Sequence, residues 1–123
     1  MSDYAMPEGQ DQSQGDPGLA VSPMARYTLH LPVHDKDKNE IAHVLGAVRK
    51  ALTQAGYNGR TVVRRVQGDW QDYDTEEMDL VMVDAPDDQQ HLQQLMQIAE
   101  GAKMLSGHPA IYLTKQPVET YLV

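Results

Sequence analysis

The side chains best able to do chemistry gather in one short stretch of the chain, residues 69–88. Half of the eighteen acidic residues lie in it: Asp69, Asp72, Asp74, Glu76, Glu77, Asp79, Asp84, Asp87 and Asp88. No Lys or Arg occurs over residues 66–102, whereas Arg64 and Arg65 come just before the stretch. Carboxylates this dense repel one another unless water or cations screen them. The stretch therefore predicts either a docking surface for a basic partner or a solvated acidic face partly neutralised by the two arginines.

Two aromatic residues, Trp70 and Tyr73, stand among these acids. Exposed aromatic side chains beside charges are typical anchors of protein interfaces. The alternative is that Trp70 packs against the end of a core that contains no Phe, because large aromatic side chains are strongly stabilised by burial. The predicted partner-binding residues are Trp70, Asp72, Tyr73, Asp74, Glu76 and Glu77.

The same acids are chemically suited to bind a metal ion, since carboxylate oxygens suit Mg²⁺ and Ca²⁺. Glu76, Glu77 and Asp79 fit neither an EF-hand loop nor another metal-binding spacing. The chain has no Cys, and its five His residues show no ligand spacing. A phosphate-binding Gly-Lys loop, a dinucleotide glycine fingerprint and a serine nucleophile elbow are also absent. We therefore expect no metal and no cofactor, and an enzyme is the less favoured class.

Five strands are predicted around these residues. Residues 26–33 alternate, with Tyr27, Leu29 and Leu31 on one face and His30 on the other, which is typical of a half-buried strand. Residues 60–67 and 76–84 are rich in β-branched and apolar residues and are expected to form a hairpin. Residues 110–114 form the next strand, and a short final strand is expected over residues 118–123, after Pro117.

Two helices are predicted between the strands, over residues 40–55 and residues 87–105, from apolar residues at helical spacing. Asp37 with Glu40 fits a capping box for the first helix. Asp87 with Gln90 three residues later can cap the second, and Pro86 stands just before it.

The order strand, helix, strand, strand, helix, strand over residues 26–114 resembles the ferredoxin-like superfold. That resemblance implies an α+β fold, a βαββαβ sandwich whose antiparallel sheet carries two helices on one face, with the first and third strands central. It also implies likeness to small regulatory members that oligomerise through the open sheet face. No family-specific motif is present, so no catalytic residue is carried over.

On the open face of such a sheet, His30 and Arg64 are the candidate site residues. His30 could meet a carboxylate of the third strand, and a pair with Glu77 would supply an acid and a base. The alternative is that His30 is a surface or interface histidine, because a catalytic pair requires hydrogen-bonding geometry before anything else.

Length and charge limit the classes of function. A chain of 123 residues predicts a single domain, here residues 26–123. Residues 1–25 hold four acids and no Lys or Arg, together with three Gly and three Pro, which predicts a disordered acidic tail. A net charge of −8 argues against direct binding to nucleic acid. No apolar run reaches the ~20 residues of a membrane span, and no secretory pattern begins the chain, so a cytoplasmic location is expected.

The main functional prediction is a small acidic, non-enzymatic protein-interaction or regulatory domain that binds a basic partner surface, with a phage or mobile-element inhibitor as one example. The alternative is a small-ligand-binding or enzymatic ferredoxin-like oligomer that uses the sheet face, for which a homodimer is one candidate form. A third class is a structural subunit that assembles through the open face and the C-terminal strand, and the polar Thr28 and His30 disfavour it.

Overall fold

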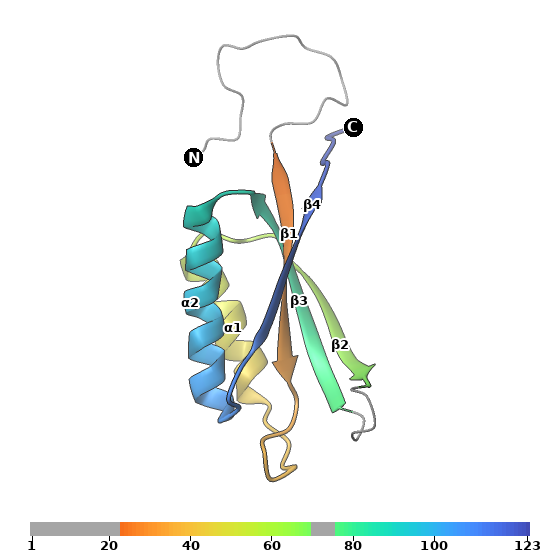
Figure 1. Cartoon of the computed structure of the whole chain (residues 1–123), viewed down its shortest axis with the longest axis vertical. Coiled ribbons are helices and arrows are strands. Elements are labelled where there is room, and N and C mark those ends of the chain that lie inside the picture. Colours follow the sequence, from red (N-terminus) through yellow and green to blue (C-terminus); the bar gives the residue numbers. More distant parts are fainter. Residues whose placement is uncertain (1–22, 70–75) are drawn as a thin grey trace.

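The computed structural model describes residues 23–69 and 76–123 and contains one sheet and two helices. The elements in chain order are β1 (Met24–Pro32), α1 (His43–Gln54), β2 (Thr61–Gly68), β3 (Glu76–Pro86), α2 (Gln89–Ser106) and β4 (Tyr112–Val118). The strands are ordered β2-β3-β1-β4, and every neighbouring pair is antiparallel. Both helices lie on the same side of the sheet (Figure 1). The predicted α+β ferredoxin-like fold, with the first and third strands central, is confirmed.

The core lies between the helices and one face of β1 and β3. The alternation predicted for β1 is confirmed, since Tyr27, Leu29 and Leu31 are each only 1% exposed. Against them pack apolar side chains of both helices, including Leu52 and Leu95, which are fully buried. Each such leucine contributes about 2 kcal/mol through burial alone, so the helix-facing side of the sheet carries most of the stability.

The second strand is interrupted by a β-bulge, where the register with β3 shifts between Val63 and Val66. Arg65 in the bulge has a φ of 56°, a left-handed conformation uncommon for a residue other than glycine. Asp79 of β3 lies opposite the bulge and is 5% exposed. Its carboxylate accepts hydrogen bonds from the Arg65 backbone N–H at 2.9 Å and from Arg64 Nε at 3.1 Å. A buried carboxylate therefore holds the distorted part of the edge strand.

Both predicted helix starts differ from the structure. Helix α1 begins at His43 and has no side-chain cap. The carboxylate of Asp35 instead accepts from the backbone N–H groups of Asp37 and Asn39 and closes a turn before the helix. Helix α2 is capped by Asp88, one residue after the predicted position, and the Asp88 carboxylate accepts from the His91 N–H at 2.8 Å.

The two ends of the chain also differ from the predicted boundaries. Met24 and Ala25, assigned by prediction to the tail, belong to β1, and Ala25 is fully buried. The rest of the predicted tail lies outside the described residues. At the other end, β4 continues through Pro117 to Val118, and residues 119–123 form no separate strand. An edge strand tolerates proline because its outward-facing N–H needs no partner in the sheet.

Candidate functional site

The side of the sheet that faces away from the helices is the first candidate surface, and we call it the open face. The strand registers bring its residues into cross-strand rows, so that His30 lies between Leu80 and Tyr112. The row of His30, Leu80, Val63 and Tyr112 is largely apolar, the next row holds Met82 among three threonines, and one end is polar. The members of the open face are Arg26, Thr28, His30, Thr61, Val63, Val66, Met78, Leu80, Met82, Asp84, Tyr112, Thr114 and Gln116.

The imidazole of His30 contacts β4 rather than a carboxylate. Its Nε2 atom lies 3.4 Å from Thr114 Oγ1, and its ring meets Tyr112 edge-on with 5.1 Å between centroids. Burial lowers the pKa of His30 from its ordinary value, so the imidazole is held neutral. Glu77 is three positions from Leu80, the residue opposite His30, and alternation therefore places Glu77 on the other side of the sheet. The predicted acid–base pair is wrong.

Arg64 does not join His30 either, because its guanidinium pairs with Asp79 on the helix-facing side. Arg65 forms ion pairs with Glu77, at 3.1 Å, and with Glu40 in the loop before α1. The two arginines before the acidic stretch thus neutralise carboxylates of their own chain. Of the two interpretations of the acidic stretch, the described contacts agree with the solvated face that the two arginines partly neutralise.

Four of the six predicted partner-binding residues, Trp70, Asp72, Tyr73 and Asp74, lie outside the described residues. Glu76 begins β3 and is exposed.

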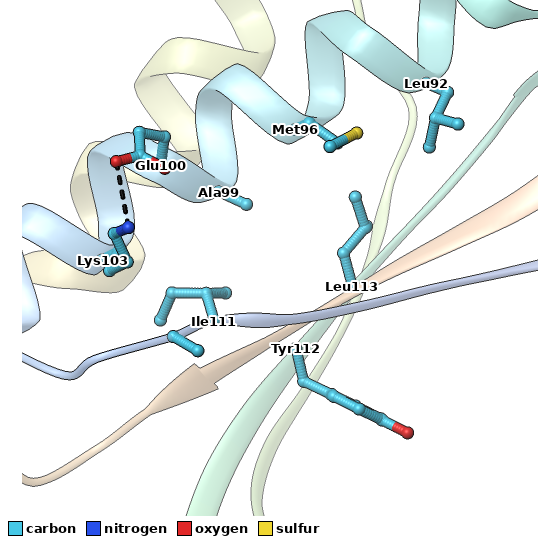
Figure 2. A pocket seen from close by; sticks show the side chains of 9 residues that line it. Leu92, Met96, Ala99, Glu100, Lys103, Ile111, Tyr112 and Leu113 are labelled. Atoms are coloured by element: carbon cyan, nitrogen blue, oxygen red, sulfur yellow. Dashed lines mark ion pairs between the residues drawn. The ribbon is translucent and has the colours of Figure 1, made fainter.

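A groove between α2 and the edge strand β4 is the second candidate. Figure 2 shows Leu92, Met96 and Ala99 of α2 facing Ile111 and Leu113, whereas Tyr112 points to the opposite side. Its volume is about 440 Å³, and its charged groups are Glu100 and Lys103, which pair with each other at 3.1 Å. The groove can accept an apolar group, but it presents no unpaired polar side chain for chemistry. A similar apolar groove of about 500 Å³ separates α1 from α2.

A polar depression at one end of the open face is the third candidate. It has a volume of about 290 Å³ and is lined by Arg26, Gly59, Arg60, Thr61, Met82 and Asp84. Arg26 forms a two-pronged ion pair with Asp84, at 2.8 and 2.9 Å. That hydrogen bonding lowers the pKa of Asp84, so the carboxylate stays ionised. Arg60 is held by neutral oxygens, because its Nη1 donates to Thr53 Oγ1 at 2.8 Å and to the Tyr57 carbonyl at 3.0 Å.

Sequence reasoning missed this depression. Arg26 and Asp84 are 58 residues apart, and only the β1–β3 register brings them opposite each other. One signal was available, since both residues occupy outward positions of strands predicted to be central neighbours. Arg60 immediately precedes β2, and its place beside Met82 and Asp84 depends on the hairpin register.

Within residues 23–69 and 76–123 the structure contains neither a metal-binding cluster nor a membrane-spanning helix. No three His, Asp or Glu side chains there converge in a way that would hold a metal ion. Neither of the two helices combines the length and apolar character that a membrane crossing requires.

Comparison with known proteins identifies the fold. No family profile matches the chain, and no curated protein sequence matches it. Among solved structures, CutA1 from Oryza sativa superimposes with a TM-score of 0.54 at 11% identity, over 80% of this chain and 83% of that one. CPII, a nitrogen regulatory PII-like protein from Thiomonas intermedia bound to ADP, AMP and bicarbonate, gives 0.54 at 12% identity, over 82% and 96%. The divalent cation tolerance protein CutA1 from Thermus thermophilus gives 0.53 at 14% identity, over 77% and 84%.

These matches correct the main functional prediction. The acidic charge pointed to an interaction domain or inhibitor that binds a basic surface, but the chain shares its fold with CutA1 and with a PII-like regulator that holds small ligands. Of the two predictions, only the alternative is tied to this ferredoxin-like fold. The physical reason for the error is that net charge governs solubility and association rather than fold, and that Arg26, Arg64 and Arg65 pair with acids of the stretch.

Proposed function

We propose that this chain is a non-enzymatic regulatory protein that binds a small anionic ligand of the nucleotide class and acts as a homo-oligomer. The single observation that carries the proposal is the structural match, over 82% of this chain, to a PII-like regulator bound to ADP, AMP and bicarbonate. A catalytic role is not proposed, because the described contacts of His30 are a hydroxyl and an aromatic ring rather than a carboxylate.

Assembly through the open face is supported by its composition. Val63 and Tyr112 are 36% and 66% exposed although they are large and apolar, and Leu80 and Met82 lie between their strands. One end of the face is polar, with the Arg26–Asp84 ion pair. An apolar centre with a polar rim is the usual anatomy of a protein interface. A second copy of this chain is therefore the proposed partner.

The first experiment measures oligomeric state by light scattering after size exclusion. The wild-type protein is expected to elute as a defined oligomer, and Leu80→Lys is expected to elute as a monomer because a charge would be buried at the centre of the interface. Met104→Lys is the matched control, since Met104 is 76% exposed on α2, away from the open face. A monomeric wild type, or dissociation caused equally by both variants, would contradict the proposed assembly through this face.

The second experiment measures ligand binding by thermal unfolding in the presence of nucleotides and small acids. A ligand present at a hundred times its Kd stabilises the folded protein by about 2.7 kcal/mol. For a domain of this size, that is an increase in Tm of about 10 °C or more. No change with any nucleotide or small anion would contradict the proposed ligand class.

A further inference from the structure

The guanidinium of Arg60 is the feature from which the inference starts. Its Nη1 is fixed by two neutral acceptors, Thr53 Oγ1 and the Tyr57 carbonyl. Within residues 23–69 and 76–123 it forms no ion pair with a carboxylate, in contrast to Arg26, Arg64 and Arg65. An arginine has five N–H donors in a planar fork, so Nε and Nη2 remain for a further acceptor. The side chain is thus oriented in advance, with its charge uncompensated.

The groups around Arg60 add donors and a local positive charge. Arg26 uses Nε and Nη2 for Asp84, which leaves its Nη1. The hydroxyl of Thr61 lies in the same depression, and Gly59 contributes no side chain to fill it. The lining of the depression contains two arginines and one aspartate, so the depression is locally positive although the net charge of the chain is −8. An acidic protein can hold an anion only where such a local excess overcomes the overall repulsion.

We infer that this depression binds the phosphate group of a small phosphorylated ligand, with Arg60 as the principal contact. A phosphate presents three oxygens and can accept from the Arg60 fork, from Arg26 Nη1 and from the Thr61 hydroxyl together, and arginine forks match phosphate geometry. The inference rests on the proposed ligand-binding function and names both the recognised group and its place.

The size of the depression limits what it can hold. A volume of about 290 Å³ lies just below the usual range of ligand pockets, which begins near 300 Å³. It has room for a phosphate group and an adjoining sugar, but not for a complete nucleoside diphosphate. The remainder of a nucleotide would extend past the polar rim of the open face, where a second subunit in the proposed oligomer would lie.

The test is a titration of the isotopically labelled full chain, followed by the backbone amide signals in NMR. ADP, inorganic phosphate and bicarbonate are added separately to the wild-type protein. ADP and phosphate are expected to shift the amides of Gly59, Arg60 and Thr61, and bicarbonate is expected to shift them less at equal concentration. Mapping on the wild type does not depend on whether a variant folds. Signals that move only elsewhere would overturn the inference.

Variants then assign the contact. Arg60→Gln should weaken ADP binding at least about tenfold, because a charge-assisted hydrogen-bonded pair is lost. Arg49→Gln is the matched control: Arg49 is exposed on α1, the charge change is the same, and Kd should stay within about twofold. Asp84→Asn should tighten binding, because it removes the acid that competes for Arg26. Arg60→Lys keeps the charge without the fork and should recover only part of the affinity.

The outcomes separate this inference from the proposed function. Equal ADP affinity in the wild type and Arg60→Gln would overturn the site and leave ligand binding in place. If a ligand without phosphate binds and no phosphorylated ligand does, the phosphate site is also overturned and ligand binding is left in place. A monomer that binds neither nucleotides nor small anions would remove both the site and the proposed function.

Discussion

The carboxylate of Asp79 offers the sharpest test of how the fold is held. It is buried, and it accepts the backbone N–H of Arg65 inside the β-bulge of β2. Replacing Asp79 by Ala leaves that partly buried N–H without its acceptor, beside a side-chain position that is itself only 5% exposed. The substitution also releases Arg64, whose side chain is 55% exposed and can return to water.

The magnitude follows from these two contacts. An unsatisfied buried donor costs about 1–3 kcal/mol, whereas an exposed ion-pair partner contributes about 0–1 kcal/mol. Asp79→Ala should therefore lower the free energy of unfolding by about 2 kcal/mol, nearly all of it from the backbone hydrogen bond. Asp79→Asn keeps an acceptor oxygen but loses the charge, and about half of that loss is expected because hydrogen bonds to charged groups are roughly twice as strong.

The assay is equilibrium unfolding in urea at one fixed protein concentration, since an oligomer's stability depends on concentration. With a slope of about 1–3 kcal/mol per molar, a loss of about 2 kcal/mol moves the midpoint by about 1 M. Glu76→Ala is the control, because it removes an acid from the same strand at an exposed position. If Asp79→Ala stays within about 0.5 kcal/mol of wild type, or if Glu76→Ala is equally destabilising, the carboxylate does not hold the bulge.

Three further predictions use the same measurement. Asp88→Ala should cost about 1 kcal/mol, because the first turn of α2 loses its cap on the His91 N–H, and no loss would contradict that role. Gly107→Ala should cost about 1 kcal/mol at its φ of 74°, whereas Gly46→Ala, in an open place within α1, should stabilise by about 0.5–1 kcal/mol. The reverse order would refute the backbone argument. Burial lowers the pKa of His30 below 6.5, so on acidification the imidazole of the unfolded chain takes up its proton before that of the folded chain. The contribution of His30 to the free energy of unfolding is therefore complete above about pH 6.5 and decreases as the pH falls through that value. His30→Gln should therefore flatten the loss of stability between about pH 7 and about pH 5, and an unchanged slope would argue against the effect of burial.

The fold could be predicted because its signals are local. Alternation in residues 26–33 and helical spacing in the two helices were enough to place Tyr27, Leu29 and Leu95 in the core. The capping residues were harder to predict, because several acids lie within a few residues of each helix start and any of them can accept the same backbone hydrogen bonds. Before the first helix, Asp35 rather than Asp37 accepts backbone N–H groups, those of Asp37 and Asn39. Before the second helix, Asp87 pairs with Lys115 of β4, and Asp88 is the cap.

The site residues were predicted less well, and strand register is the reason. Glu77 was considered as a partner for His30 on the open face, but the β1–β3 register puts Leu80 opposite His30 and Glu77 on the other side of the sheet. The bulge at Arg65 adds a further shift that no local pattern announced. The acids that suggested a basic partner find arginines of their own chain only once β2, β3 and β1 are aligned.

The sequence by itself determined the order of elements, the residues that form the core and the acidic character of the chain, because hydrophobic period and charge are properties of neighbouring residues. Tertiary structure alone decided which arginines form ion pairs with carboxylates of the same chain. Arg26 meets Asp84 across 58 residues, and Arg60 is held by neutral oxygens beside them. Such long-range pairing depends on strand register and a bulge, and these are fixed by packing over the whole sheet.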